Sequence, residues 1–482
     1  MIGMIGMMTG IYLICAFVIA GLLFINRKTQ VNNILIILFG LLQILFTFYA
    51  GYNYKSTELQ YFTFDSIGLL LLITLSIIAI PALFHSYLYI RRHDETPQSR
   101  SIYFSAIVVL LTSISVAYLA NHIAVIWIFT ELTTLSASML IYHHRNKLAL
   151  EGTWKYVFIC AISITFVFIG ILFLSLSLRN AGSNDLSFAN LMAYKDKLNP
   201  FWLRLSFLFI FTGFTAKLGL VPMYTAGIDA KDKAPAPTGA LLASVLMNLG
   251  FIGIFRIYAI VAQTQLFHWA NLIIFIAAFL SIFVATVYMT KVLNIKRMFA
   301  YSGIEHMGIV MLGIAAGGVG YYAAILHIIL HAFVKSSLFF QFNQLYRTFQ
   351  SKSIQYVGNY FKYNPAGAMV LLLGFISATA MPPSGLFVSE FLIFRSLFEG
   401  KHFILLLIVL LLLTIVIYAF GKNIMKILFL PVQGFDESHV PRINPWESLT
   451  QYILLFTAIW LGLNPPSIFV EMIQDAVKIL PH

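Results

Sequence analysis

Acidic and basic side chains inside apolar stretches are the residues of this sequence best suited to chemistry. Glu131 lies in the apolar segment HIAVIWIFTELTTLSASML, and Lys217 lies in FLFIFTGFTAKLGLVPM. A charged residue at the centre of a membrane helix costs about 2.5–3.5 kcal/mol or more, so it usually faces the protein interior and has a function. An acid and a base that interact tune each other's proton affinity. We therefore predict that Glu131 and Lys217 pair in a proton pathway, with a structural ion pair between two helices as the alternative.

A second set of titratable residues follows one predicted helix. His327, His331 and Lys335 stand four residues apart, which places them on one helix face at roughly 6 Å per step. Glu390 lies in a later apolar segment, LFVSEFLIF. Two histidines at this spacing could bind a metal ion, but no third carboxylate or thiol ligand stands nearby in the sequence. The spacing therefore favours a proton relay over a metal site.

Three other polar positions could connect these groups. Asn248, in a strongly apolar segment, could hold a water between charged neighbours, or it could simply bond one helix to another. Glu305 and His306 are expected nearer a membrane face, as an access or connecting element. Asp229 and Lys231 lie in a predicted polar turn, where a cytoplasmic loop face is favoured over a place at the start of the pathway. Alternating acidic, basic and polar groups are what a proton wire through the middle of the membrane requires.

Two apolar segments are interrupted by proline and glycine. The first breaks at GLVP, which includes Pro222, and the second at MPPSG, which includes Pro382 and Pro383. Irregular backbone at membrane depth is tolerated only where it is buried in protein or lines a watered cavity. Corresponding interrupted helices in two halves of a chain are typical of inverted-repeat transporters. The alternative is that proline and glycine are common in membrane helices in any case.

The composition sets the class of protein. Hydrophobic residues make up 60% of the 482 residues and charged residues only 10%, whereas a soluble domain carries roughly 25% charged residues. Cys15 and Cys160 both lie in apolar segments, which supports neither a disulfide framework nor a metal cluster. The sequence therefore predicts an all-α polytopic membrane protein with about 14 transmembrane helices. The predicted spans lie near 9–26, 32–50, 66–90, 103–120, 122–142, 153–178, 201–226, 238–262, 267–291, 297–315, 319–341, 364–396, 402–429 and 446–466.

Basic residues gather in alternate loops of this predicted bundle, and the formal net charge is +12. Loops near Asn121, Thr264 and 317–320 carry almost no lysine or arginine. The positive-inside rule places the basic loops in the cytoplasm and both termini outside. No basic patch interleaved with aromatic residues asks for a nucleic-acid partner. The first apolar run lacks a basic flank and a small-residue cleavage site, so it is interpreted as a span and not as a signal peptide. The basic loops are at 27–28, 91–92, 145–147, 231–233, 291–297 and 347–352.

Taken together, these motifs resemble those of the antiporter-like membrane subunits of complex I and of membrane-bound hydrogenases, which are homologous to Mrp-type cation/proton antiporter subunits. The sequence is most similar to the hydrogenase-4 type of membrane subunit. The segments that carry the resemblance are WIFTELTTL, TAKLGLVPM, KRMFAYSGIEHMGIV, HIILHAFVKSSLFF and MPPSGLFVSEFLIF. The resemblance implies a fold with two inverted five-helix repeats and breaks in the seventh and twelfth helices. Its expected parts are three N-terminal helices (1–100), a first repeat (101–262), a second repeat (263–430), and a C-terminal loop with the last helix (431–482).

The resemblance also implies roles for the residues. Glu131 and Lys217 would form the coupled pair of a first half-channel, Lys335 a connecting site reached through the two histidines, and Glu390 the titratable group on the outlet side. Asn248 stands where relatives often have lysine, so water is expected to span that gap. The segment AGIDAK at 226–231 replaces the family's usual Trp-Leu-Pro-Asp-Ala-His, so proton uptake from the cytoplasm is expected to differ.

The main functional hypothesis is a membrane subunit that moves protons, or exchanges Na⁺ for H⁺, within a larger redox complex of a prokaryotic plasma membrane. Such a chain is expected to hold no cofactor of its own. Iron–sulfur, nickel–iron or flavin groups belong to its partners, which are the other membrane and peripheral subunits of a respiratory or hydrogenase complex. Two alternatives stand beside it. One is a membrane subunit of a bicarbonate-accumulating complex with a zinc-containing partner, and the other is an Mrp-type antiporter subunit.

Overall fold

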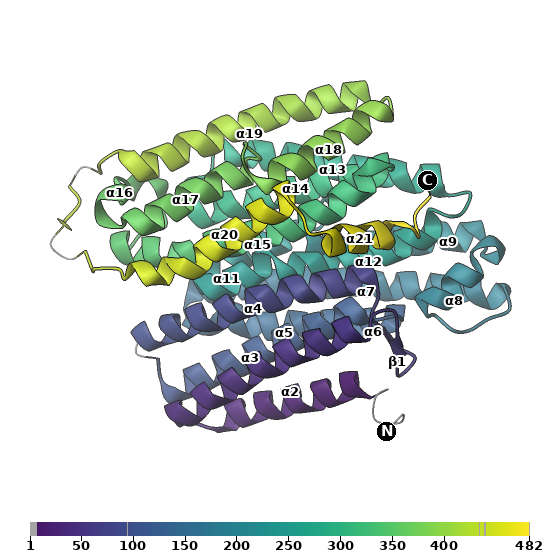
Figure 1. Ribbon diagram of the computed structural model, residues 1–482, viewed down its shortest axis with the longest axis horizontal. Helices are drawn as coiled ribbons and strands as arrows, with labels where there is room; N and C mark the ends of the chain where they lie inside the picture. Colours follow the sequence, from purple (N-terminus) through teal and green to yellow (C-terminus); the bar gives the residue numbers. More distant parts are fainter. Residues whose placement is uncertain (1–6, 94, 433, 438–439, 482) are drawn as a thin grey trace. The chain divides into compact units, whose positions relative to one another are not determined.

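The computed structural model describes residues 7–93, 95–432, 434–437 and 440–481. These residues form helices almost throughout, with one short antiparallel hairpin of β1 (Thr57–Glu58) and β2 (Phe62–Thr63) (Figure 1). The chain divides into two compact units. The first unit is Met1–Ala234, Val245–Leu272 and Glu471–Pro481, and the second is Pro235–Ser244 and Ile273–Val470.

The first unit contains the N-terminal helices and the first interrupted segment. Two short elements, α8 (Phe188–Ala193) and the turn η2 (Lys195–Lys197), cross one end of the unit. The remaining helices are α2 (Met8–Ile25), α3 (Thr29–Tyr52), α4 (Ser66–Arg92), α5 (Pro97–Leu119), α6 (Ile123–Ile141) with the turn η1 (Tyr142–His144), α7 (Lys147–Asn180), α9 (Pro200–Leu218), α10 (Ala226–Lys233) and α12 (Val245–Val261).

The second unit is built around α15 (Val319–Phe349), which is buried along its whole apolar window. Helices α14, α17, α18, α20 and α11 all pack against it. Helix α13 (Phe267–Met289) leads into this unit, and α21 (Ser467–Val477) leads out of it. The other elements are α11 (Ala236–Ala243), α14 (Ile295–Ala316), η3 (Ile354–Tyr356), α16 (Tyr360–Tyr363), α17 (Pro365–Ala378), α18 (Gly385–Glu399), α19 (Phe403–Phe429), η5 (Pro445–Ser448) and α20 (Leu449–Leu463).

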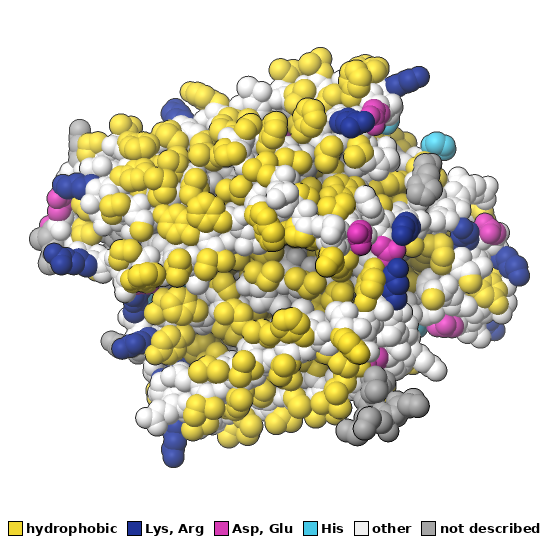
Figure 2. Space-filling model, viewed as in Figure 1, with side chains coloured by type: hydrophobic (Ala, Val, Ile, Leu, Met, Phe, Trp, Pro, Cys, Tyr) yellow, Lys and Arg dark blue, Asp and Glu magenta, His cyan; other side chains and the backbone are white. Residues whose placement is uncertain are grey.

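Polar side chains at the boundaries decide where several spans begin. Asp65 accepts a hydrogen bond from the Gly68 amide and starts α4, and Asn146 accepts from the Ala149 amide and starts α7. Such caps satisfy amide groups that a helix leaves unpaired at its first turn, typically a contribution of about 1 kcal/mol. Hydrophobic side chains then cover the sides of the helices (Figure 2). This distribution is that of a protein surrounded by hydrocarbon.

Every predicted span corresponds to helical structure. Within the described residues, twelve helices are long and apolar enough to cross a membrane, and a bent pair made of 445–463 and 467–477 gives up to thirteen. The predicted span at 364–396 is two shorter helices, α17 and α18, separated by a break. The multi-pass helical fold is therefore confirmed, whereas the inverted symmetry of the two repeats stays a prediction.

The two predicted breaks are present. Helix α9 ends at Leu218, and Gly219 then takes the left-handed conformation with φ +89°. Helix α17 ends at Ala378, and α18 starts again at Gly385 after the Ser384 hydroxyl accepts from the Phe387 amide. One expectation is wrong. The segment 226–233, predicted as a polar turn, is the helix α10, because it lies against α7 and is partly buried there.

Candidate functional site

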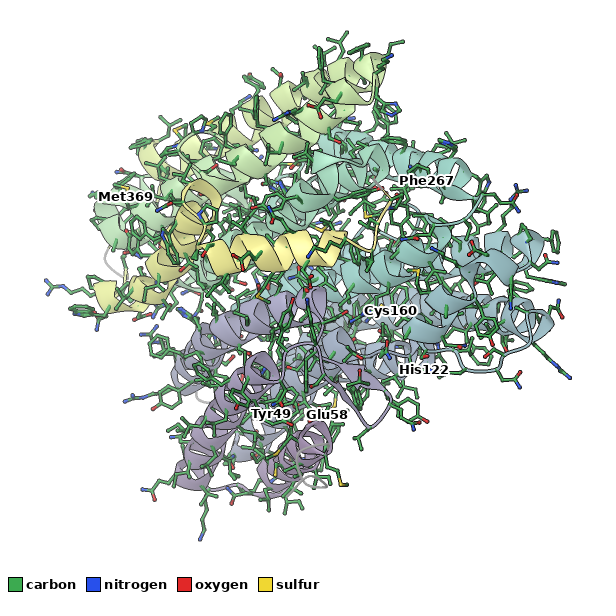
Figure 3. The ribbon with its side chains drawn as sticks, turned by 45° about the vertical axis from the view of Figure 1, so that its right-hand side comes forward. Tyr49, Glu58, His122, Cys160, Phe267 and Met369 are labelled. Carbon is green, nitrogen blue, oxygen red and sulfur yellow. The ribbon has the colours of Figure 1, made fainter. Side chains whose placement is uncertain are left out.

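Lys217 is the centre of the polar site in the first unit. It is the second-last residue of α9, and its side chain is 6% exposed. The Nζ atom donates to Thr134 Oγ1 of α6 at 2.8 Å and to Tyr156 OH of α7 at 3.0 Å. Cys160, which Figure 3 labels, stands one turn after Tyr156 on α7 and is also buried. Three helices therefore enclose one amine with hydroxyl groups.

Two glycines allow the helices to approach this closely. A Cβ atom at Gly213 of α9 would lie 2.5 Å from the carbonyl oxygen of Ser163 on α7, and one at Gly250 of α12 would lie 2.3 Å from the Leu218 amide nitrogen. Both distances are shorter than real Cβ contacts, so a larger residue would push the helices apart. The end of α9 that carries Lys217 is thus held between α7 and α12.

Glu131 does not form the predicted direct pair with Lys217. Within the described part of the chain, no ion pair joins the two side chains, and the lysine binds hydroxyl oxygens instead. Glu131 lies one turn before Thr134 on α6, part of its side chain is exposed, and its Oε2 atom is buried without a hydrogen-bond partner. Residues three apart on a helix are neighbours, about 5–6 Å between Cβ atoms. Thr134 is therefore a neighbour of Glu131 on α6 and a hydrogen-bond partner of Lys217.

Helix α10 brings a second lysine into the first unit. Lys231 is 3% exposed and its Nζ lies 3.3 Å from the Met247 sulfur. Burial favours the neutral amine and lowers the pKa of Lys231 from 10.5 to about 8. The expectation of a cytoplasmic loop face is wrong for this residue. Asp229 does lie near the surface, where its carboxylate is 3.5 Å from Lys155 Nζ.

Asn248 follows Met247 by one residue in α12 and is completely buried. Neither its amide nitrogen nor its amide oxygen has a hydrogen-bond partner among the described residues. An unsatisfied buried amide costs roughly 1–3 kcal/mol, and such groups are usually bonded to water. Within the described residues, Asn248 therefore forms no direct side-chain bond between helices, and its water-holding role stays a prediction.

Lys335 is the buried amine of the second unit. It is 0% exposed in the middle of α15. Its Nζ donates to the Ser302 hydroxyl of α14, and the carbonyl oxygen of Phe299 lies 3.4 Å away. The two lysines are thus alike in one respect, because each amine donates to at least one hydroxyl group of a neighbouring helix.

His306 lies deep in the second unit and is 1% exposed, in the middle of α14. Its Nδ1 is 3.1 Å from Nε2 of His327, whose Nδ1 is 3.0 Å from the Ser389 hydroxyl of α18. Its Nε2 is 3.0 Å from the carbonyl oxygen of Ala378, the last residue of α17. In a continuous helix that carbonyl would accept from residue 382, but Pro382 has no N–H. The predicted break therefore supplies the acceptor that fixes His306.

The direction of this hydrogen-bond chain follows from its ends. A carbonyl oxygen only accepts, so His306 carries hydrogen on Nε2, and its Nδ1 accepts from His327 Nε2 when both rings are neutral. His327 Nδ1 then accepts from Ser389. That hydroxyl also lies 3.0 Å from the carbonyl oxygen of Leu386. If His327 takes up a proton on Nδ1, the hydroxyl can donate to Leu386 instead, so the chain can hold one more proton without a backbone movement.

The remaining predicted residues surround this chain. The His331 ring lies 5.2 Å from the His306 ring, centre to centre. Glu305 is 3% exposed, with its Oε2 atom 3.9 Å from His306 Nε2. Glu390 follows Ser389 on α18 and is 8% exposed. Across the described residues, no group of three or more histidine, cysteine, aspartate or glutamate side chains is arranged to hold a metal ion.

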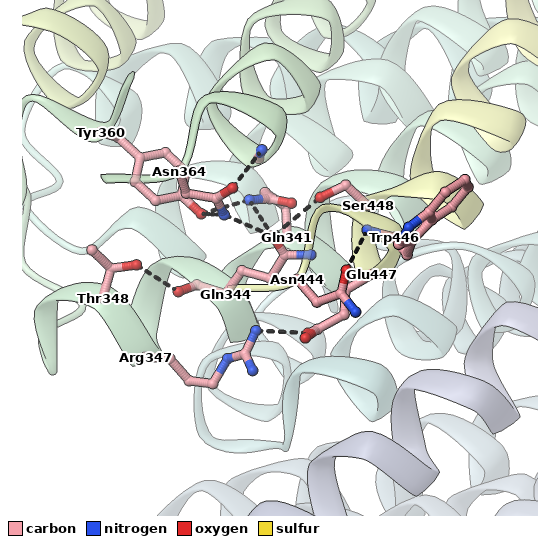
Figure 4. A network of polar contacts seen from close by, with 11 residues as sticks. Gln341, Gln344, Arg347, Thr348, Tyr360, Asn364, Asn444, Trp446, Glu447 and Ser448 are labelled. Carbon is pink, nitrogen blue, oxygen red and sulfur yellow. Dashed lines mark hydrogen bonds and ion pairs between the residues drawn. The ribbon is translucent and has the colours of Figure 1, made fainter. Parts of the chain in front are cut away.

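A separate polar cluster holds the end of α15 that follows Lys335. Arg347 pairs with Glu447 of η5 at 2.7 Å. Farther inside, Gln341, Gln344, Tyr360, Asn364 and Ser448 bond to one another (Figure 4). This cluster joins α15, α16, α17 and the start of α20. It lies outside the residues that the sequence singled out.

A model of the family described as NADH:quinone oxidoreductase/Mrp antiporter, TM matches residues 120–416, a range that contains Lys217, Lys335 and both helix breaks. The chain belongs to this family. Its segment before residue 120, which includes α2 to α5, lies outside the match.

Similar proteins match this member of the NADH:quinone oxidoreductase/Mrp antiporter family over nearly its whole length. It is 27% identical to the hydrogenase-4 component F homolog of Methylacidiphilum infernorum, over 87% of this chain and 89% of that protein. It shares its fold with a chain of an archaeal membrane-bound sulfane sulfur reductase (TM-score 0.85, 18% identity, 99% and 97% coverage). It also shares it with a chain of the Mrp complex from Dietzia (TM-score 0.84, 13% identity, 99% and 97% coverage).

Proposed function

We propose that this chain is a proton-translocating subunit of a redox-driven membrane complex, with one buried proton-handling site in each unit. The observation that carries this proposal is the chain from the Ala378 carbonyl through His306 and His327 to Ser389. It lies inside a membrane helix bundle, and its serine end can accommodate a changed number of protons, because the Ser389 hydroxyl can donate either to His327 or to Leu386. A structural hydrogen-bond network would not need two titratable rings in series.

In the first unit, Lys217 would hold the transferred proton. Its hydroxyl partners, Thr134 and Tyr156, can accept from a charged amine and can donate to a neutral one, so either protonation state is satisfied. Glu131 would supply the negative charge one turn away, and Lys231 and Asn248 would carry protons and water toward the cytoplasmic side. In the second unit, Lys335, His331, Glu305 and Glu390 would extend the histidine chain.

The chemistry of the buried groups favours H⁺ over Na⁺ as the transported ion. Hard cations prefer oxygen ligands, several at a time. The innermost groups of both sites are amines and imidazoles, and each lysine nitrogen points at the oxygens that a cation would need. An amine that already binds those oxygens competes with a metal cation and exchanges protons instead.

The names of the relatives support the kind of assembly. The hydrogenase-4 component F homolog and the chain of the sulfane sulfur reductase support a redox complex. We propose that its partner subunits carry the iron–sulfur, nickel–iron or flavin groups. The description of the family, which names an Mrp antiporter, supports proton or cation transport by the membrane part. The bicarbonate-accumulating alternative finds no such support and is not carried further. We place the complex in a prokaryotic plasma membrane with both termini outside, on the distribution of basic loops.

The test is proton uptake by proteoliposomes that contain the purified complex, followed together with the redox activity of its partner subunits. Lys217→Ala and Glu131→Ala are expected to abolish uptake while the complex still assembles. Thr134→Val, which keeps the shape and removes the hydroxyl, is expected to lower it. The control is Lys422→Gln, an exposed lysine of α19. Normal uptake in both alanine variants would rule out the proposal.

A further inference from the structure

Helices α3 and α4 of the first unit enclose an apolar groove of about 480 Å³. This lies within the range of roughly 300–1,000 Å³ in which proteins bind small organic ligands. Gly40 forms part of its floor, with room for a Cβ atom 3.7 Å from the Ile80 side chain. Ile37 and Leu41 on its wall are 63% and 52% exposed. The groove is therefore open along the side of the helices, where hydrocarbon would surround them.

One end of the groove is polar. Asn33 and Tyr87 line the groove, and both also line a second cavity of about 230 Å³. The two cavities are therefore neighbours that share a wall. The larger cavity is apolar and follows the helices, and the smaller one at its end is polar. The second cavity is completed by the side chains of Thr29, Ile90, Arg91, Glu95, Arg100 and Phe104.

The described residues that line the polar cavity carry more positive than negative charge. Arg100 donates from Nη2 to the carbonyl oxygen of Arg27 at 3.1 Å, while its Nε is buried without a hydrogen-bond partner. Arg91 forms no ion pair with any residue that the structure describes. The carboxylate of Glu95 is directed to His143, 3.0 Å away. Among the described lining residues, two guanidinium groups therefore share the cavity with one carboxylate, which is bonded to His143.

The start of α3 adds to this charge. Thr29 is the first residue of this 24-residue helix, and Lys28 before it provides no side-chain cap. The first amide groups of the helix are therefore left without the usual side-chain acceptor, and the helix dipole is positive at this end. Helix N-termini of this kind bind phosphate groups readily. Together with the arginines, the cavity offers a binding site for an anion at the end of an apolar groove.

We propose that an anionic phospholipid binds the first unit, with one acyl chain in the groove between α3 and α4 and its phosphate at Arg91, Arg100 and the N-terminus of α3. The apolar groove fits the acyl chain of a phospholipid, and the cationic cavity at its end fits the phosphate. The basic loops at 27–28 and 91–92 are those predicted on the cytoplasmic side, where anionic lipid attracts basic residues. A membrane helix of another subunit would fill the groove but would leave the two arginines without a partner.

The experiment counts lipids retained by the purified complex. Complex in nanodiscs of phosphatidylglycerol and phosphatidylcholine is extracted into detergent, washed, and analysed by mass spectrometry. The wild type is expected to retain phosphatidylglycerol in preference. Arg91→Gln and Arg100→Gln should each lower the preference about fivefold, the equivalent of about 1 kcal/mol per basic residue near a membrane surface. Gly40→Phe, which fills the groove, should lower retention of both lipids.

Two matched variants separate this site from general effects of charge and bulk. Arg92→Gln removes a neighbouring arginine that does not line the cavity, and Gly21→Phe adds a ring to a lipid-facing position of α2 with nothing within 4 Å. Neither should change retention. Equal retention of the two lipids, or equal losses in Arg91→Gln and Arg92→Gln, would overturn the proposal. So would cross-linking of Leu41→Cys to a partner subunit, because a protein helix would then occupy the groove.

Discussion

Replacement of Lys231 by methionine should make the protein more stable at neutral pH. The two side chains are similar in volume, so Lys231→Met removes the charge and keeps the packing against Met247. The pKa of the lysine is lowered from 10.5 to about 8 in the folded protein. The pKa is thus lower by about 2.5 in the folded protein, and a pKa difference of one corresponds to about 1.36 kcal/mol. Below pH 8, the charged lysine therefore lowers the free energy of unfolding by about 3 kcal/mol.

The pH dependence distinguishes this origin from better packing. Between about pH 8 and pH 10.5 the unfolded chain binds more protons at this position than the folded one, so the wild type gains stability as pH rises. At about pH 9.5 the remaining cost is about 1 kcal/mol, so the advantage of the variant should fall by at least half.

The assay is thermal unfolding of the purified complex, wild type against Lys231→Met, at about pH 7 and about pH 9.5. Lys147→Met, at an exposed lysine of α7, is the control and should show no pH-dependent gap. A variant less stable than wild type at neutral pH, or a gap of the same size at both pH values, would refute the reasoning.

Two further predictions concern the other buried groups. Asn248→Leu should leave stability unchanged or raise it by about 1 kcal/mol, because the unsatisfied amide is removed, yet it should slow proton uptake if the amide holds water; loss of stability with normal uptake would contradict this. Pro382→Ala restores an N–H that competes for the Ala378 carbonyl, so it should weaken the bond of His306, worth about 0.5–1.5 kcal/mol, and lower uptake. The ¹⁵N shift of His306 Nε2 would report this change, and Pro383→Ala, whose nitrogen lies one position farther on, should leave both unchanged.

The fold was predictable because hydropathy acts over long windows. About 20 consecutive apolar residues are needed to cross the hydrocarbon, so errors at single positions average out, and each predicted span corresponds to a helix. The breaks were predictable for a related reason, since proline and glycine act on the backbone directly. Segment 226–233 was not, because half of its residues are polar and only its packing against α7 makes it helical and buried.

The predicted titratable residues are in the bundle interior or next to it, but their partners could not be predicted. Serine and threonine in membrane helices usually bond to a carbonyl of their own helix. Thr134 does so with Thr130, and Ser302 with Phe299, in addition to binding a lysine. Nothing in the sequence marks which hydroxyl has a second partner. The opposite charges of Glu131 and Lys217 suggested a direct contact. In the structure, Lys217 donates instead to the hydroxyl group of Thr134.

His306 is bonded to a main-chain carbonyl and not to a side chain. This changes the positions at which natural variation or a mutational scan would reveal the histidine site. The Ala378 carbonyl is present whatever side chain stands at 378, so glycine or serine there would leave the bond to His306 in place. The site depends instead on Pro382, four residues later, because proline has no N–H that could compete with His306 for this carbonyl. A scan that scores residues by side-chain loss should therefore find position 378 limited by size alone and Pro382 limited by identity.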